Sequence, residues 1–110
     1  MAEASKTLAQ SNPSAATLTD LYTAPADTST IASSIFVVNR GGSGSAKFRI
    51  AIAKAGEADS LKQYIYYDLP IDENDTFVAT VGITLEATDV VRIETDIATL
   101  SFNLMGVEIT

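Results

Sequence analysis

The sequence predicts an all-β fold, an antiparallel β-sandwich of the jelly-roll or immunoglobulin-like kind with about seven to eight strands. Short apolar segments rich in β-branched and aromatic residues recur about every 8–12 residues along the chain. Segments rich in Gly, Pro, Ser and Asp separate them and favour turns. No window carries a convincing apolar stripe at the helical period.

Seven segments are strand candidates because they alternate apolar and polar side chains or are rich in strand-favouring residues. They are residues 16–23, 29–39, 47–54, 61–68, 76–85, 90–96 and 99–110. In the second segment Phe36 and Val38 alternate with other apolar residues, so its second half is expected to be buried on both faces. The Gly-rich segment 41–45 then predicts a hairpin between 29–39 and 47–54.

Two further features of these segments involve proline and glycine. Pro70 is expected to end the pairing of the tyrosine-rich strand before it, because proline lacks a backbone N–H. Segment 76–85 is expected to be one continuous strand with Phe77, Val81 and Leu85 on one side. Gly82 lies on the opposite face and indicates a bulge or a close contact.

The composition changes near residue 15, which divides the chain into residues 1–15, an N-terminal arm, and residues 16–110, the sandwich domain. Within the arm, residues 5–10 are only a weak strand candidate. An extended arm can add a strand to the open sheet edge of a neighbour. We therefore expect a chain without residues 2–13 to fold but to assemble poorly.

The composition excludes several classes of function. With 7 basic and 14 acidic residues the net charge is −7, which disfavours binding to nucleic acid. The chain contains neither cysteine nor histidine, so it cannot form a disulfide, a Cys/His zinc site or a Ser-His pair. No apolar segment is long enough to span a membrane, and the first 13 residues lack the apolar run of a signal peptide.

The acidic residues do not predict catalysis or metal binding. Asp72, Glu73 and Asp75 share one short segment, which we interpret as a solvated turn rather than a calcium site or an acid/base pair. The other acids lie on predicted loops or on the solvent side of strands. We therefore expect a protein that is not an enzyme and that carries no metal or cofactor.

Five residues are candidates for an interface. Tyr64 and Tyr66 are expected to share one face of their strand and Tyr67 the other, so one set caps the core. The other set forms an exposed aromatic strip, which serves either edge packing or binding to a carbohydrate. Lys47 and Arg49 lie on the solvent side of the neighbouring segment, where they either contact an acidic partner or are simply solvated.

An ordered series of short motifs extends through most of the chain. The motifs are LYTAP (21–25), VVNR (37–40), FRI (48–50), YYD (66–68), NDT (74–76), GITL (82–85), TDV (88–90) and LSFN (100–103). In this order they resemble a family of small β-sandwich proteins and modules of tailed bacteriophages. Members occur as separate virion proteins and as domains of tail-fibre polypeptides, notably in phages of cyanobacteria and other aquatic bacteria. The resemblance covers nearly everything after residue 16.

The resemblance implies a structural protein of the virion, assembled in the host cytoplasm, and it transfers no catalytic residues. The expected position is the tail, the baseplate or the neck–fibre apparatus. A capsid decoration protein and a host-surface glycan-binding module are the alternatives. The implied partners are other virion proteins and further copies of the chain, with a trimer favoured because phage parts sit on rotational axes. Nucleic acid and membrane are not expected partners.

Overall fold

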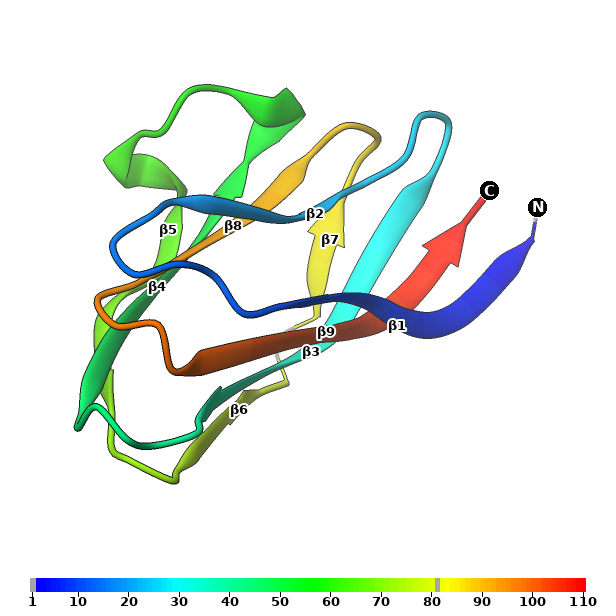
Figure 1. The fold of residues 1–110 in the computed structure, drawn as a ribbon. Helices are drawn as coiled ribbons and strands as arrows, with labels where there is room; N and C mark the ends of the chain where they lie inside the picture. Colours follow the sequence, from blue (N-terminus) through cyan, green and yellow to red (C-terminus); the bar gives the residue numbers. More distant parts are fainter. Residues whose placement is uncertain (1, 81) are drawn as a thin grey trace.

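The computed structural model describes residues 2–80 and 82–110, and its strands form two antiparallel sheets packed face to face (Figure 1). The described residues form β1 (Glu3–Ser11), β2 (Thr19–Thr23), β3 (Ser29–Asn39), β4 (Ala46–Ala53), β5 (Tyr64–Ile71), β6 (Thr76–Ala79), β7 (Ile83–Leu85), β8 (Val90–Thr95) and β9 (Leu100–Ile109). Two 3₁₀ turns, η1 (Lys54–Gly56) and η2 (Leu61–Gln63), lie between β4 and β5. The predicted β-sandwich is confirmed, with nine strands instead of seven or eight. No helix in the described part of the chain is long and apolar enough to cross a membrane.

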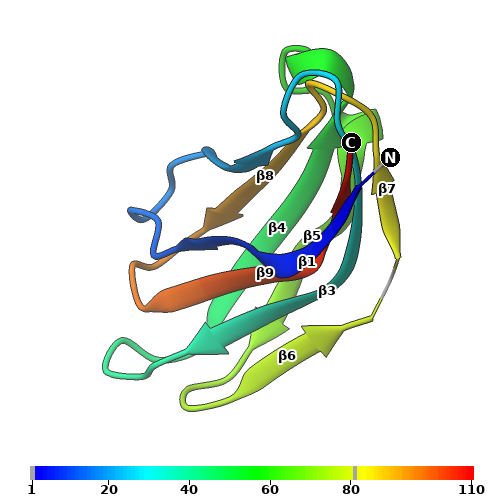
Figure 2. The same cartoon turned by 90° about the vertical axis from the view of Figure 1, so that its right-hand side faces the viewer.

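One sheet has five strands and the other has four. The five-stranded sheet has the order β1-β9-β3-β6, with β7 also paired to β3, and the four-stranded sheet has the order β2-β8-β4-β5. Figure 2 shows the two layers and the strong twist of the long strands. The two ends of the chain lie side by side, because Ala2 and Thr110 exchange two backbone hydrogen bonds of 2.9 Å.

The core lies between the sheets and follows the alternation of side chains along the strands. Fully buried large side chains come from both sheets: Ile35, Phe48, Ile50, Leu85, Ile93, Leu100, Phe102 and Leu104. The ring centroid of Phe48 lies 5.3 Å from that of Phe77 and 6.2 Å from that of Phe102, so aromatic contacts join the two layers. Phe48, Ile93 and Phe102 are fully buried, so the alternation of apolar and polar residues in segments 47–54, 90–96 and 99–110 turns one set of side chains into the core.

The predicted hairpin between residues 29–39 and 47–54 is wrong. β3 pairs with β6, β7 and β9, whereas β4 pairs with β5 and β8 in the other sheet. The Gly-rich segment therefore carries the chain from one sheet to the other, with Gly41 and Gly44 at φ values of 85° and 86°. Glycine permits this backbone conformation in a hairpin and in a crossover alike, so the local sequence does not distinguish them.

Asn39, at the end of β3, holds this crossover in place. The residue is fully buried, and its backbone N–H donates to the carbonyl of Asp75 at 3.0 Å. Its own carbonyl accepts from the N–H of Asn74 at 2.8 Å. The side-chain amide makes four further hydrogen bonds, to the Gly-rich segment, the end of β5 and the start of β9. One side chain thus connects both sheets at this end of the sandwich.

Segment 76–85 is also different from the prediction, since it is two strands and not one. β6 ends at Ala79 and β7 begins at Ile83, and both pair with β3. Gly82 lies in the break with a φ of 62°, so it marks an interruption of the strand. The predicted inward position of Val81 lies outside the described residues. Pro70 does not end the pairing either, because it lies within β5, opposite Lys47, on an edge strand where proline is tolerated.

The N-terminal residues belong to the five-stranded sheet. Residues 3–11 form β1, which pairs with β9 from Glu3 opposite Ile109 to Ser11 opposite Phe102. Leu8 and Ala9 pack against the core. The structure therefore places most of the expected arm of residues 1–15 on a sheet edge. The hydrophobic signal of this segment is weak because most of its side chains are exposed.

Candidate functional site

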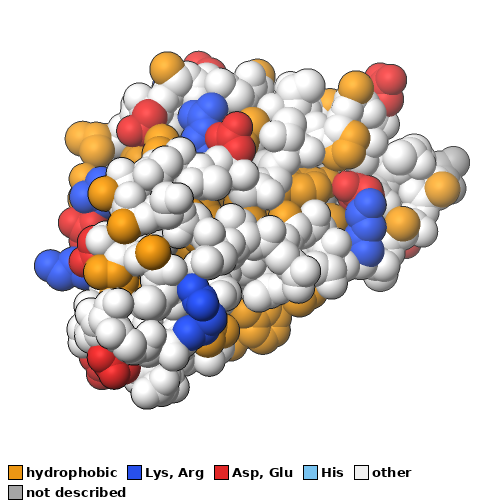
Figure 3. Space-filling view, in the orientation of Figure 1, with side chains coloured by type: hydrophobic (Ala, Val, Ile, Leu, Met, Phe, Trp, Pro, Cys, Tyr) orange, Lys and Arg blue, Asp and Glu red, His pale blue; other side chains and the backbone are white. Residues whose placement is uncertain are grey.

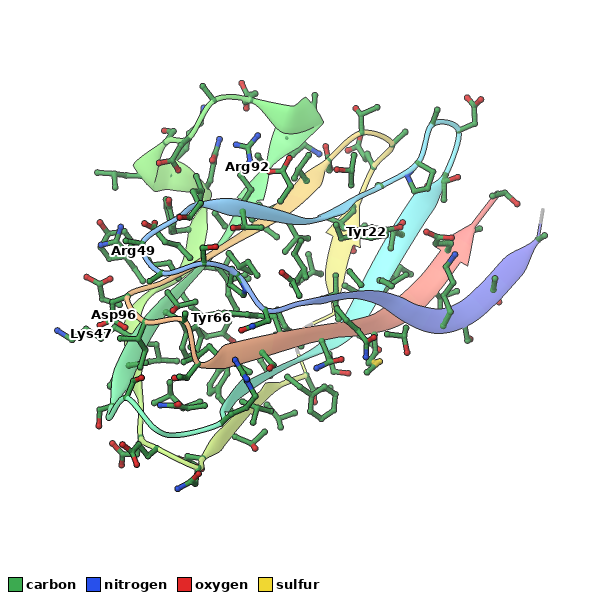
Figure 4. All side chains as sticks on the ribbon, viewed as in Figure 1. Tyr22, Lys47, Arg49, Tyr66, Arg92 and Asp96 are labelled. Carbon is green, nitrogen blue, oxygen red and sulfur yellow. The ribbon has the colours of Figure 1, made fainter. Side chains whose placement is uncertain are left out.

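The outer face of the four-stranded sheet gathers four of the five predicted interface residues. Lys47 and Arg49 point outward from β4, and Figure 4 shows them on the same side of the molecule. Tyr64 and Tyr67 of β5 lie beside them, with their ring centroids 5.1 Å apart and the rings nearly perpendicular. The side chain of Tyr67 is 51% exposed. The structure thus brings two cations and two tyrosines together.

Tyr66 does not join this group, although the sequence predicted that it shares a face with Tyr64. Its ring packs in the sandwich, 5.3 Å from the ring centroid of Phe77. The pairing of β5 with β4 shifts register twice, and Asp68 takes a φ of 54° within β5. These irregularities interrupt the simple alternation, so Tyr67 comes to lie against Tyr64.

Arg49 is the centre of an interaction cluster formed with Asp68, Glu94 and Tyr67, which we call the Arg49 cluster. Its Nε lies 2.7 Å from Oδ1 of Asp68, and its Nη1 lies 3.6 Å from Oε1 of Glu94. The guanidinium carbon lies 4.1 Å from the ring centroid of Tyr67. The hydrogen bond with Arg49 lowers the pKa of Asp68 and raises that of Arg49. The cluster therefore joins β4 to both of its neighbours and has its charges compensated locally.

A shallow hollow of about 270 Å³ adjoins the Arg49 cluster. Charged side chains of both signs line most of it, and the complete lining is Ala16, Lys47, Arg49, Asp68, Glu94, Thr95 and Asp96. Figure 4 shows Lys47, Arg49 and Asp96 at this place, and Figure 3 shows charged side chains on the same side of the surface. An exposed ring next to carboxylate and guanidinium groups suits a polar ligand with one apolar side, such as a sugar ring.

Arg92 of β8 binds the long connection from β4 to β5 to the same sheet. The sequence did not predict a role for this residue. Its Nη1 donates to the carbonyl of Glu57 at 2.6 Å, and its Nε donates to Oδ1 of Asp20 at 2.9 Å (Figure 4). The hydroxyl of Tyr64 donates to Asp59 of this connection at 2.7 Å. Burial and this hydrogen bond raise the pKa of Tyr64 to about 12. The hydroxyl of Tyr64 therefore has a structural role, because it binds the connection that precedes β5.

Asp89 is a buried carboxylate that belongs to the same end of the sheet. It accepts from the backbone N–H groups of Ala55 and Glu86, each at 2.9 Å, and from the ammonium of Lys54 at 2.9 Å. Burial alone would raise the pKa of Asp89, but these donors hold it below its ordinary value. Through these contacts Asp89, in the TDV motif, joins the turn between β7 and β8 to η1.

The acidic residues do not form a metal centre in the part of the chain that the structure describes. Asp72 accepts from the hydroxyl of Ser45 at 3.1 Å, and Glu73 accepts from the N–H of Gly44 at 2.6 Å. These two side chains therefore bind the Gly-rich segment opposite them. The acidic turn between β5 and β6 is thereby joined to the Gly-rich segment.

The outer face of the five-stranded sheet is a second candidate surface, and we call it the uncharged face. Its hydrophobic residues are Ile31, Phe36, Val38, Val78, Met105, Val107 and Ile109. Between and beside them are Ser5, Thr7, Gln10, Ser29, Ser34, Thr76, Thr84, Ser101 and Asn103. Among the paired positions that the structure describes on this face, Glu3 at one corner is the sole charged residue. In Figure 3 hydrophobic side chains emerge along the lower margin, where this face turns out of view.

None of these seven hydrophobic side chains belongs to the core cluster. Ile31 and Val78 are 41% and 49% exposed, and the others are partly exposed. The prediction that the second half of segment 29–39 is buried on both faces is therefore wrong for the single chain, because Phe36 and Val38 reach solvent. The apolar pattern of that segment was nevertheless the one sequence signal that pointed to this face.

A polar network closes the end of the sandwich far from Asn39. The hydroxyl of Tyr22 donates to Oε2 of Glu108 at 2.5 Å and lies 2.9 Å from the hydroxyl of Thr30. The ammonium of Lys6 lies 2.6 Å from Oε1 of Glu108. Lys6 and Tyr22 lower the pKa of Glu108, and burial together with Glu108 raises the pKa of Tyr22 to about 12. The network joins β1, β3 and β9 to β2 of the other sheet.

No protein-family model matches the chain, and no curated protein matches it either. What the protein does must therefore be inferred from its own surfaces and from the motif series. The structure offers two surfaces for this purpose, the Arg49 cluster with its hollow and the uncharged face.

Proposed function

We propose that this chain is a structural protein of a bacteriophage virion that self-associates and docks on the particle, in the tail, the baseplate or the neck–fibre apparatus. The observation that carries the proposal is the uncharged face, a whole sheet surface with seven hydrophobic residues in a chain of net charge −7. A sheet face that exposes hydrophobic side chains and is depleted of charge is typical of a protein–protein contact. The motif series supports the assignment to phage.

The fold fits the mechanical task of such a part. The two sheets are joined by hydrogen bonds at both ends, through the side chain of Asn39 at one end and through the Tyr22 and Glu108 network at the other. A scaffold fixed in this way presents its outer surfaces with little rearrangement on binding. The proposed partners are other virion proteins and further copies of this chain, and the proposed location is the assembled virion.

The proposal is tested by immunogold labelling of purified phage particles with antibodies against this chain. Gold on the tail, the baseplate or the neck–fibre region is the expected result. Gold confined to the capsid faces would replace the tail position with capsid decoration. Particles that carry no gold, while the same antibodies detect the isolated chain, would overturn the virion role altogether.

A second candidate function is binding to a host-surface glycan, and the exposed ring of Tyr67 beside the 270 Å³ hollow favours it. Arg49 contacts this ring and also lines the hollow, so a sugar stacked on Tyr67 would have a guanidinium group beside it. The test is a glycan array with the wild-type chain, Tyr67→Ala and a control, Leu61→Ala, at an exposed side chain that lies outside the hollow and outside the uncharged face. Binding that is lost in Tyr67→Ala and kept in Leu61→Ala supports this function. No binding, or binding unchanged by Tyr67→Ala, removes it.

A further inference from the structure

We propose that the uncharged face is the contact between two copies of this chain, packed sheet against sheet about a two-fold axis. This inference rests on the self-association in the proposed function and names the surface and the partner. Three features of the described residues carry it: the size of the face, the absence of charge on it, and the arrangement of its hydrophobic residues.

The face has the size that a stable dimer needs. β3 contains 11 residues and β9 contains 10, and the sheet is four strands wide because β6 and β7 both lie beside β3. With about 3.4 Å per residue and about 4.8 Å between strands, the face measures about 37 by 19 Å, or about 700 Å². Specific protein interfaces bury about 800 Å² on each partner. Sheet-on-sheet packing of the kind found inside a sandwich would therefore use the whole face.

The charge distribution favours a second copy on this face over the other sheet surface. Two chains of net charge −7 repel each other, so contact is easiest where neither copy places a charge in the interface. The outer face of the four-stranded sheet has Lys47, Arg49, Asp68, Glu94 and Asp96 within one hollow, and closing it would require these groups to be desolvated. Among the described paired positions of the uncharged face, Glu3 at a corner is the one charged residue.

The hydrophobic residues are placed so that the face complements itself. Ile31, Val107 and Ile109 lie at one end, and Phe36, Val38 and Val78 lie at the other. Two copies can pack about a two-fold axis with the same ends of their faces in contact or with opposite ends in contact. In both arrangements hydrophobic residues of one copy meet hydrophobic residues of the other. The same contact would cover Phe36 and Val38, so β3 would be buried on both faces, as its apolar pattern indicates.

A two-fold contact predicts pairs of chains, whereas the trimer that the resemblance implies needs a contact between unlike surfaces. The subunit count of the full chain, measured by size-exclusion chromatography with multi-angle light scattering, distinguishes the two. The expected mass is twice the 11.6 kDa of one chain. The double variant Ile31→Lys/Val78→Lys places four ammonium groups in the paired face. It is expected to raise the dimer dissociation constant at least about 100-fold.

The matched control is Leu61→Lys/Ile65→Lys, which makes the same change at residues that are 77% and 44% exposed and lie in η2 and in β5 of the four-stranded sheet. It is expected to leave the dimer intact, and circular dichroism checks that both double variants stay folded. Because the chain has no cysteine, Ser34→Cys offers a second measurement near the middle of the face. It is expected to form a disulfide-linked dimer on oxidation, whereas Ile65→Cys is not.

Three results would overturn the inference. They are a wild-type chain that stays monomeric at all concentrations, a trimer, and a dimer that withstands Ile31→Lys/Val78→Lys with no cross-link from Ser34→Cys. In each case gold on phage particles would leave the virion role in place, with a different surface as the contact. Conversely, a dimer that behaves as expected, with no gold on particles, would support the contact and remove the virion role.

Discussion

Replacing Asn39 by aspartate tests the claim that one buried amide holds the crossover between the sheets. The Asn39 Nδ2 donates to the carbonyl oxygens of Gly44 at 3.0 Å and Ile71 at 3.3 Å. Its Oδ1 accepts from the N–H of Gly41 at 3.1 Å and the hydroxyl of Thr99 at 3.0 Å. Asn39→Asp keeps the shape and both accepted hydrogen bonds, but it replaces the two N–H donors by an oxygen that faces two carbonyl oxygens.

The expected loss in the free energy of unfolding is large. Two hydrogen bonds are worth about 1 kcal/mol each, and a buried carbonyl left without a donor costs about 1–3 kcal/mol more. Asn39→Asp is therefore expected to lose about 3–5 kcal/mol at pH 7, a substantial part of the about 5–15 kcal/mol typical of a domain. Burial and the two carbonyls raise the pKa of the new carboxyl in the folded state above its unfolded value. The loss therefore grows as pH rises between these two pKa values, and it shrinks at lower pH.

The assay is urea unfolding followed by circular dichroism at pH 7 and at pH 4.5, with the wild type measured at each pH and one protein concentration throughout. The control is Asn12→Asp, the same change at a side chain whose Oδ1 accepts from Arg40 at the surface, at 2.8 Å. It is expected to change stability by less than about 0.5 kcal/mol. A loss below about 1 kcal/mol for Asn39→Asp at pH 7, or a loss that does not shrink at pH 4.5, would refute the reasoning.

Four further changes test other parts of the fold. Gly106→Ala is expected to destabilise the chain by about 1–3 kcal/mol, because its Cβ would overlap the carbonyl oxygen of Ile31; an unchanged urea midpoint would contradict this. Tyr22→Phe is expected to cost about 1–3 kcal/mol because Glu108 loses a buried donor, again read from the urea midpoint. The pKa of Glu108 is lowered in the folded state, so the stability of the wild type falls as pH drops through that lowered pKa. Glu108→Gln should reduce this loss of stability at low pH, as measured by the melting temperature between pH 3 and 6. Removing residues 2–11 should lower the melting temperature because it uncovers the edge of β9; a wild-type melting temperature would show that the segment is a detachable arm after all.

Part of the candidate site could be predicted from the sequence. Lys47 and Arg49 were placed on a solvent face because they alternate with Phe48 and Ile50, and that periodicity depends only on neighbouring residues. The positions of Tyr66 and Tyr67 could not be predicted, because the irregular pairing of β5 with β4 breaks the alternation. Nothing in the local sequence marks where such an irregularity falls.

The sequence by itself determined that the chain is built of strands and which residues form most of its interior, since both follow from short-range alternation and residue type. Only the tertiary structure decided which strands are neighbours: that β3 and β4 lie in different sheets, that residues 3–11 pair with β9, and that Phe36 and Val38 lie on an open face. The physical reason is that a strand obtains its hydrogen-bonding partner from a distant part of the chain. Strand pairing, and with it the surface left open for another protein, is a property of the assembled sheets.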